Sequence, residues 1–280
     1  MQDEPIKGTF SLKFGSEGSG KGQFKCPRSL ASSADELFVA GGYNPRVDVF
    51  SVKGEFKVSI GGPNEGDSDG LFKYPYGVHI HGDELFVSDN DRQDVQVFSV
   101  NKERKFLRKF GKGHLRAPRG LCVVGDSEVW VSDSGLAQVV VFDIKTGQLL
   151  KTIGSTQGSG DKQFNCPSDV CVVGEEVFVS DSNNKRLQVL SKAGKFVRRI
   201  GSAGQFVDPA GLCFHAGEVY VSDYLGHRIV VVDPASGKTL RTFGKKGTGD
   251  GEFDNPYGVA VLQGQLFVSD EGNHRIQSFV

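Results

Sequence analysis

A phrase that recurs six times along the chain predicts an all-β fold, a six-bladed β-propeller of four-stranded antiparallel blades. Each copy opens with an aromatic residue or leucine, two further residues and a proline, and successive prolines lie 48, 43, 49, 42 and 47 residues apart. The prolines are Pro27, Pro75, Pro118, Pro167, Pro209 and Pro256. After each proline come an apolar run, a tight turn, a strand that usually ends Val-Ser-Asp, a second apolar strand and a basic strand ending in glycine. A period in the forties with four short strands is typical of one propeller blade.

The sixth copy stops before its basic strand, at Val280. Residues 8–15 (GTFSLKFG) have the same length and pattern as the basic strand at 194–201 (GKFVRRIG). We therefore expect residues 8–15 to form the outer strand of blade 6 and to fasten the first blade to the last. The sequence predicts one domain over residues 1–280, with blades at about 24–62, 72–111, 115–154, 164–201, 206–244 and 253–279.

The composition fits an all-β chain. There are 38 glycines and one methionine among 280 residues, and no stretch places apolar residues at helical spacing. The formal charge of −1 argues against a protein that holds duplex nucleic acid by bulk electrostatics. No N-terminal hydrophobic segment and no apolar run of transmembrane length are present, so we expect a soluble, cytoplasmic monomer without membrane contact.

Aspartates that recur at the end of the second strand are expected to build the scaffold. They are Asp89, Asp133, Asp181, Asp223 and Asp270. A carboxylate at a strand end can accept hydrogen bonds from backbone N–H groups of nearby turns. Five residues later an arginine recurs, at Arg46, Arg186, Arg228 and Arg275, which can bond the same carboxylates or turns. Asp94 and Gln138 interrupt the arginine pattern and predict a more acidic or neutral sector of the ring.

Cysteine and histidine positions favour packing over metal binding. Cys122, Cys171 and Cys213 lie four residues after their blade's proline, where a small buried residue suits the tight packing near the axis. Cys26 and Cys166 occupy opposite blades, too distant for a disulfide, so reduced thiols are expected. We expect no metal and no cofactor, because the paired Cys-x-x-Cys spacing of zinc sites is absent. The six histidines are His79, His81, His114, His215, His227 and His274.

Three segments resemble parts of a known repeat. The signature of NHL repeats is similar to residues 268–276 (VSDEGNHRI) and 226–229 (GHRI). The opening of the same repeat is similar to residues 253–261 (FDNPYGVAV). The resemblance extends over all six copies and implies a propeller. NHL propellers include RNA-binding and protein-binding modules of tripartite-motif ubiquitin ligases, sensor domains of bacterial kinases and a zinc-dependent lyase that makes peptide amides. The lyase would require several histidines converging on zinc; His81 and His215 share a register on opposite blades, which is too few.

Candidate binding residues come from positions where the six copies differ. The residue after each proline should lie near the inner rim of the face that carries the loops from second to third strand. Around the ring it is Arg28, Tyr76, Arg119, Ser168, Ala210 and Tyr257. Because blade 6 adjoins blade 1, the four larger residues should form one arc of alternating aromatic and cationic side chains. The arc is extended by Tyr74, Lys73, Arg116, Tyr43 and Arg46.

Three interpretations of this arc remain open. Tyrosine and arginine dominate the binding energy of many protein interfaces. The same residues can stack on unpaired bases and meet phosphates of single-stranded RNA. They can also simply cap packed strands. We favour a non-catalytic scaffold that binds protein or peptide ligands on the loop-bearing face, with single-stranded RNA as the alternative. A metal-dependent lyase or hydrolase is the less favoured prediction, because Asp169 is the only inner carboxylate.

Overall fold

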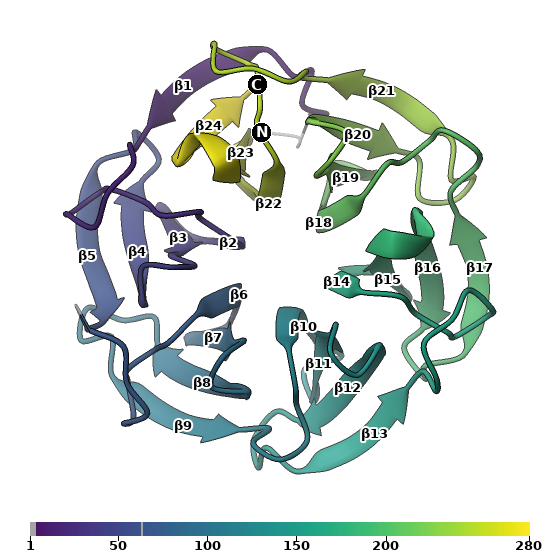
Figure 1. The fold of residues 1–280 in the computed structure, drawn as a ribbon, viewed down its shortest axis with the longest axis horizontal. Helices are drawn as coiled ribbons and strands as arrows, with labels where there is room; N and C mark the ends of the chain where they lie inside the picture. The colour runs from purple at the N-terminus through teal and green to yellow at the C-terminus, as the bar shows by residue number, and fades with distance from the viewer. Residues whose placement is uncertain (1–3, 63) are drawn as a thin grey trace.

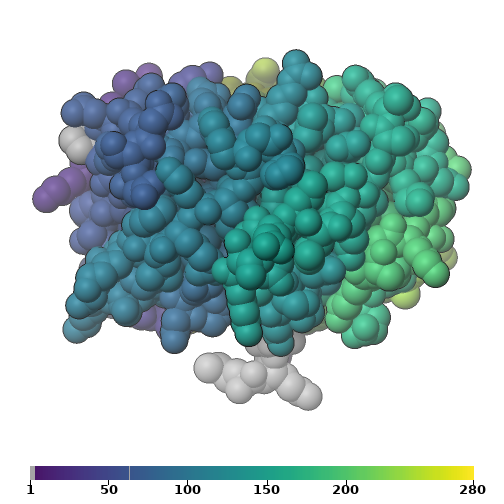
Figure 2. Space-filling view, turned by 90° about the horizontal axis from the view of Figure 1, so that it is seen from below, coloured from purple at the N-terminus to yellow at the C-terminus, as the bar shows by residue number. Residues whose placement is uncertain are grey.

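The computed structural model describes residues 4–62 and 64–280, which form 24 strands in six four-stranded antiparallel sheets. The sheets stand around a central axis as the blades of a propeller (Figure 1), which confirms the predicted fold class. Seen from the side, the blades stand next to one another as a squat cylinder (Figure 2). Within the described ranges, no helix has the length and hydrophobicity that crossing a membrane requires.

The first three blades follow the chain in order, each from the innermost strand outward. Blade 1 contains β2 (Leu30–Ser33), β3 (Glu36–Ala40), β4 (Arg46–Ser51) and β5 (Phe56–Gly61). Blade 2 contains β6 (Pro75–His81), β7 (Glu84–Asp89), β8 (Asp94–Ser99) and β9 (Phe106–Phe110). Blade 3 contains β10 (Pro118–Val124), β11 (Glu128–Asp133), β12 (Gln138–Asp143) and β13 (Leu149–Ile153).

The last three blades repeat this order, with short 3₁₀ turns in blades 4 and 6. Blade 4 contains β14 (Pro167–Val173), β15 (Glu176–Asp181), η1 (Ser182–Asn184), β16 (Arg186–Ser191) and β17 (Phe196–Ile200). Blade 5 contains β18 (Pro209–His215), β19 (Glu218–Asp223), β20 (Arg228–Val232) and β21 (Thr239–Phe243). Blade 6 contains β22 (Pro256–Leu262), β23 (Gln265–Asp270), η2 (Glu271–Asn273), β24 (Arg275–Phe279) and the N-terminal β1 (Phe10–Phe14).

Two faces of the ring have different loops. We call the face with the loops from second to third strand, and with the connections between blades, the upper face. The opposite face, which carries the other two sets of turns, is the lower face. Each innermost strand therefore runs along the axis from its proline, at the upper face, to the lower face, as β6 does from Pro75 to His81.

The N-terminal strand closes the ring as predicted. β1 pairs antiparallel with β24, with Lys13 opposite Gln277 and Phe14 opposite Ile276. The chain ends add to this pairing, because the backbone N–H of Val280 donates to the carbonyl of Thr9 at 2.9 Å. Residues before β1 also contact blade 5: Ile6 is buried, and its N–H donates to the Tyr220 hydroxyl at 2.9 Å. Residues 1–3, which the predicted domain includes, lie outside the described residues.

Apolar side chains fill the space between neighbouring blades. In one cluster Trp130 and Ile153 of blade 3 pack against Phe164 and Val179 of blade 4. The aromatic residue that opens each repeat is part of this core, since Phe164 is fully buried along with Phe24, Phe72 and Phe253. Each blade thus buries its faces only against its neighbours, as stacked repeats must.

A buried serine links five of the six blades to the next one near the axis. The serines, which precede the recurring aspartates, are Ser88, Ser132, Ser180, Ser222 and Ser269. Their hydroxyls bond backbone carbonyls of the following blade, those of Arg119, Ser168, Ala210, Tyr257 and Arg28 respectively. Blade 1 has Ala40 at this position, and its link to blade 2 is instead a backbone bond from the Ser29 N–H to the Tyr76 carbonyl at 3.1 Å. Hydrogen bonds therefore join all six blades around the axis.

These links bring neighbouring inner strands so close that a side chain does not fit between them. A Cβ added at Gly77 would lie 2.2 Å from the Arg119 carbonyl oxygen, and one at Gly211 would lie 2.3 Å from that of Tyr257. Glycine occurs two residues after the proline in four blades for this reason. Blade 4 has Asp169 there, and its Cα would lie 2.7 Å from a Cβ on Gly120.

The recurring aspartates are structural, as predicted. Asp181 is fully buried and accepts hydrogen bonds from the Asn165 N–H at 2.7 Å, the Asn184 amide at 2.8 Å and the Arg186 guanidinium at 2.8 Å. It thereby ties the end of β15 to the loop before β14. The same carboxylate–arginine pair recurs at Asp270 and Arg275, 2.7 Å apart.

The acidic sector expected at Asp94 is not formed. Asp94 is buried and pairs with Arg92 at 3.0 Å, and Arg92 also donates to the Gly66 and Ser68 carbonyls. Arg92 thus replaces the missing arginine of the repeat from two residues upstream. The sequence pattern misplaced this charge because arginines of blades 1, 2, 4, 5 and 6 bond carbonyls of the preceding loop, while in blade 2 the arginine lies at a different position along the chain. In blade 3 the Gln138 amide donates to the Ser155 carbonyl instead, so this position is neutral as expected.

Removing residues 1–15 should leave the edge of β24 unpaired and detach the first blade from the last. We expect a fall in the thermal unfolding midpoint on the order of 10 °C, together with association through the free edge. Differential scanning calorimetry and light scattering measure both effects. Appending residues 8–15 after Val280 through a short turn should restore the midpoint. A truncated protein that keeps its midpoint and remains monomeric would show that β1 does not hold the ring.

Ser180→Ala should lower the free energy of unfolding although it removes only one oxygen atom. The change leaves the Ala210 carbonyl and the Asp169 N–H, both bonded to the Ser180 hydroxyl, without their partner. An unsatisfied buried polar group costs about 1–3 kcal/mol. Urea unfolding should show this loss, whereas Ser127→Ala on an exposed turn should change the unfolding free energy by less than about 0.5 kcal/mol. Equal effects of the two substitutions would contradict the role of the serine links.

Candidate functional site

Two tyrosines close the axis at the upper face. Tyr76 of β6 and Tyr257 of β22 are each 5% exposed, and their rings meet edge to face with centroids 5.2 Å apart. Ala210 of β18 packs against both rings. Such edge-to-face contacts are favourable because the positive edge of one ring meets the negative face of the other. Side chains from blades 2, 5 and 6 therefore meet at the axis.

Two arginines complete this cluster from above and from the side. The Arg28 guanidinium lies 4.9 Å from the centroid of Tyr76 and 5.3 Å from that of Tyr257, and it pairs with the Glu271 carboxylate. The Arg119 guanidinium lies 5.4 Å from the Tyr76 centroid and donates to the Ser168 hydroxyl at 3.0 Å. Cations over aromatic faces that have lost water contribute more than exposed ones. We call Arg28, Tyr76, Arg119 and Tyr257 the axial lid.

The structure brings all four predicted arc residues together, but it corrects their arrangement. They converge on the axis and bury one another, whereas the sequence analysis expected an arc near the inner rim of this face. Blades opposite one another explain the difference. Tyr76 faces Ala210 across the ring and Arg28 faces Ser168, so these two large side chains extend toward small ones. Arg119 and Tyr257 face each other and are both large. The two small residues, Ser168 and Ala210, leave the space that the four large side chains fill.

The five residues predicted to extend the arc have separate environments. Tyr43 is 62% exposed and packs edge-on against Tyr74, with centroids 4.9 Å apart. The Tyr74 hydroxyl accepts from the Arg28 guanidinium at 2.7 Å, and Arg116 lies exposed on the neighbouring connection. Lys73 pairs with the exposed Asp67 at 2.8 Å. Of the predicted binding residues outside the lid, Tyr43 and Arg116 are thus the most accessible.

Arg46 serves the scaffold. Its guanidinium bonds Asp48 at 2.9 Å and the Ser19 and Gly20 carbonyls at 2.7 Å each. This is the same function that Arg186 performs in blade 4. Its neighbours line a groove of about 520 Å³ on the upper face that includes Ser19, Tyr43 and Glu65.

The sequence analysis missed four residues of the upper face. Tyr224 packs against Tyr257 with centroids 6.0 Å apart, and Glu271 supplies the buried carboxylate for Arg28. Val207 and Leu225 of blade 5 are apolar and largely exposed, at 41% and 54%. Leu225 and Tyr224 could have been found as departures from the repeat in the loop that follows each recurring aspartate. No pattern in the sequence distinguishes Val207.

Below the lid, the channel contains two adjoining cavities of about 220 and 460 Å³. Both are lined by His79 of β6 and Phe214 of β18, and the smaller one also by Asp169. Burial raises the pKa of Asp169 to about 7 and lowers that of His79 to about 4. The Asp169 oxygens accept from the Val170 and Leu212 N–H groups at 2.9 and 2.8 Å.

Three thiols line these cavities beside His79. Cys122 and Cys171 border the smaller cavity and Cys213 the larger one. All five cysteines of the chain are free, as expected. Burial raises the pKa of each of these three thiols, that of Cys213 to about 12, so they remain protonated at neutral pH.

The histidines do not converge. His227 and His274 accept backbone N–H groups through Nδ1 at 3.1 Å each. At the lower face His81 lies 3.3 Å from Asp126, and His215 Nε2 lies 3.2 Å from the Glu4 carbonyl oxygen. Across residues 4–62 and 64–280, no three His, Cys, Asp or Glu side chains are grouped as metal ligands would be. The residues therefore do not fit the zinc site of an amidating lyase.

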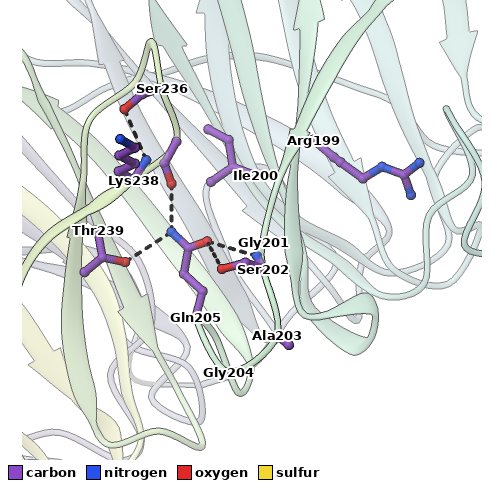
Figure 3. Close-up of a pocket in the computed structure, with 11 residues that line it drawn as sticks. Arg199, Ile200, Gly201, Ser202, Ala203, Gly204, Gln205, Ser236, Lys238 and Thr239 are labelled. Carbon is purple, nitrogen blue, oxygen red and sulfur yellow. Dashed lines mark hydrogen bonds between the residues drawn. The ribbon is translucent and has the colours of Figure 1, made fainter.

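An outer groove of about 780 Å³ lies between blades 4 and 5, far from the axis (Figure 3). The Gln205 side chain crosses it, donating to the Gly237 carbonyl at 2.8 Å and to the Thr239 hydroxyl at 3.2 Å. The side-chain oxygen of Gln205 accepts from the Ser202 N–H at 3.1 Å, while Arg199 points away from this network. The amide thus ties neighbouring blades together, which is a structural role.

Comparison with known sequences identifies repeats and distant relatives. The NHL repeat model matches residues 164–190 and 253–279. A probable peptidyl-alpha-hydroxyglycine alpha-amidating lyase, pgal-1 of Caenorhabditis elegans, is 30% identical over 113 residues, covering 39% of this chain and 32% of that protein. Peptidylglycine alpha-amidating monooxygenase of Rattus norvegicus is 35% identical over 141 residues, covering 45% of this chain and 14% of that protein. The chain thus spans a third or less of the length of these relatives.

Solved structures share the fold at low sequence identity. A structural genomics protein of unknown function from Bacteroides thetaiotaomicron superposes with a TM-score of 0.73 at 16% identity, covering 96% of this chain and 76% of that one. Such a likeness concerns the fold alone. Together with the matched repeats and the ring closed by β1, it shows that this chain carries NHL repeats within a six-bladed β-propeller.

Proposed function

We propose that the chain is a non-catalytic scaffold whose upper face binds a protein or peptide ligand. The observation that carries the proposal is a set of three accessible aromatic and apolar side chains on the face that the axial lid closes. Tyr43 on blade 1, and Val207 and Leu225 on blade 5, are exposed on this face. Isolated exposed apolar residues are common, but here they lie on two sides of a buried cluster that fixes the surface.

The lid supports binding by holding this surface in place. Tyr76 and Tyr257 are too buried to contact a ligand with their ring faces. They instead fix Arg28, which positions the Tyr74 hydroxyl, and Tyr74 in turn supports Tyr43. A preformed surface binds more tightly because less side-chain entropy is lost on association.

The charges of the upper face favour a peptide over RNA. Arg28 is paired with Glu271, Arg46 with Asp48, and Lys73 with Asp67. Arg92 likewise pairs with Asp94. Cations already matched by carboxylates release few counterions from a phosphate backbone, and that release supplies most of the affinity of nucleic-acid binding.

Some relatives of this chain are amidating enzymes, and one fold can support many functions. The fold alone is therefore compatible with both binding and catalysis. The geometry of the site speaks against catalysis in this chain. At the upper face Arg28 is paired with Glu271 and Arg119 bonds the Ser168 hydroxyl, and the rings of Tyr76 and Tyr257 lie between these groups and the channel that contains Asp169 and His79. No nucleophile and base are brought together with a third, orienting group among the contacts described above.

Selection of a displayed random peptide library against the whole chain, followed by binding assays on variants, tests the proposal. Tyr43→Ala and Leu225→Ala should each weaken selected peptides by about 1–3 kcal/mol, as anchors of an interface do. Leu107→Ala is the matched control, because Leu107 is similarly exposed on the outer strand β9. Isothermal titration calorimetry measures the affinities, and all three variants should keep the wild-type melting temperature.

Three results would contradict the proposal. Peptides whose binding ignores Tyr43 and Leu225 but depends on Leu107 would move the site to the outer strands. Tighter binding of a single-stranded RNA pool, with log affinity falling steeply against log salt and more gently after Arg116→Ala, would favour the RNA alternative. Failure to select any peptide would remove the support for a peptide ligand.

A further inference from the structure

The channel beneath the axial lid has the features of a small-molecule site. Its two cavities share His79, Phe214 and Val259, so they form one cup that narrows toward Asp169. Volumes of about 220 and 460 Å³ bring the cup into the range typical of ligand pockets, which are mostly apolar with a few polar groups. The lid closes its upper end, and the mouth opens at the lower face beside His215.

We propose that this cup binds a small primary amine with an apolar body, whose ammonium group pairs with the Asp169 carboxylate. The amine enters from the lower face. Its apolar part lies against Phe214 and the valines of the inner strands, and its ammonium group reaches the narrow end. This site is separate from the upper face and does not depend on the function proposed for it.

The lining determines the charge that the cup accepts. Among the described residues that line the two cavities there is no lysine or arginine. Asp169 therefore lacks a cationic partner in the cup, which disfavours anionic ligands and favours a cation. Each Asp169 oxygen accepts one backbone N–H, whereas an ionised carboxylate has about four acceptor positions, so positions remain for an ammonium group.

Asp169 is a departure from the repeat that the scaffold does not require. Four other blades have glycine at this position, and blade 1 has Ser29. The ring therefore closes without a carboxylate at this level. Phe214 is a second departure of this kind, because it is 41% exposed on an inner strand although it is large and apolar. An exposed aromatic wall and a partly buried carboxyl group at the end of the same cavity are what an amine with an apolar body requires.

The surrounding groups set the pH range over which Asp169 titrates. The titratable groups around it are Cys171 on its own strand, Cys122 on β10 and Cys213 on β18; from β15 only the hydroxyl of Ser180 contacts it. The three thiols remain protonated at neutral pH, and His79 is neutral above about pH 5 because burial lowers its pKa to about 4. His215 lines the larger cavity at its mouth, so a variant at this position serves as a control for the pH dependence of binding.

Calorimetric titration of the whole chain with phenethylamine, phenethyl alcohol and hydrocinnamate tests the site. The three probes share an apolar body and differ in the charge of the head group. At pH 8 the amine should bind at least about 10-fold more tightly than the alcohol, and hydrocinnamate should bind least. The affinity for the amine should fall about 10-fold per pH unit below pH 6, as Asp169, with its pKa raised to about 7 by burial, becomes protonated.

Variants distinguish the contribution of the Asp169 carboxylate to affinity from that of the cavity walls. Asp169→Gly, which restores the residue of four other blades, should reduce amine affinity to that of the alcohol. Asp169→Asn repeats the test with side-chain volume retained, in case the glycine variant does not fold. Phe214→Ala should weaken the amine and the alcohol alike, and His215→Gln should leave the pH dependence unchanged. Arg116→Ala on the upper face is the control and should bind all probes as the wild type does.

Several outcomes would overturn the proposal. Equal binding of amine and alcohol, or undiminished amine binding by both Asp169 variants, would mean that the carboxylate takes no part. Preferred binding of hydrocinnamate would mean that the charge of the cup has been assigned wrongly. Absence of amine binding up to about 10 mM at pH 8, by calorimetry and by ligand-observed NMR, would mean that the cup is not a site for this class of ligand.

Discussion

The close approach of neighbouring inner strands, held by the buried serine links, is the constraint on which the rest of the structure depends. Ser180, for example, bonds the carbonyl of Ala210 in the next blade at 2.6 Å while accepting the N–H of Asp169 in its own. At this separation most blades admit only glycine two residues after the proline. Six strands brought so near one axis leave little room for the side chains one position earlier. Those side chains must share a single space, so two of the six, Ser168 and Ala210, are small, and the four large ones meet as the axial lid.

The lid divides the channel into two chemical environments. Within the lid, Arg28 pairs with Glu271 among tyrosines, where the loss of water strengthens both the ion pair and the contact of the cation with the rings. Below the lid, the walls are apolar or neutral, and the Asp169 carboxyl is partly buried without a lysine or arginine in the lining. The ion pair in the lid therefore does not compensate a charge on Asp169. Each face must be treated as a separate surface with its own ligand chemistry.

The sequence predicts the fold well because its information lies in a repeat. Intervals between prolines and a missing final strand were sufficient to predict six blades and closure by residues 8–15, and the aspartate–arginine pairs followed from turn chemistry. The site was predicted less well because register locates a residue around the ring and along the axis but does not give the reach of its side chain. Tyr76 and Tyr257 were assigned to the correct level, yet nothing in their spacing shows that their rings meet 5.2 Å apart. The pairing of sizes across the axis, Tyr76 with Ala210 and Arg28 with Ser168, was the signal that could have indicated a closed lid.

A residue that departs from the repeat is interpreted differently depending on whether a neighbouring residue takes over the structural role of the missing one. Asp94 replaces an arginine, but Arg92 supplies the missing guanidinium from nearby, so the contacts with the preceding loop are kept. Asp169 and Phe214 have no such compensation: the other blades show that glycine or serine suffices at the first position, and the second exposes a large apolar surface inside the channel. Tyr43 and Leu225 are likewise uncompensated on the upper face. Partly burying a carboxyl group and exposing aromatic surface both cost free energy in the unliganded protein, and a ligand that pairs with the first and covers the second recovers that cost on binding.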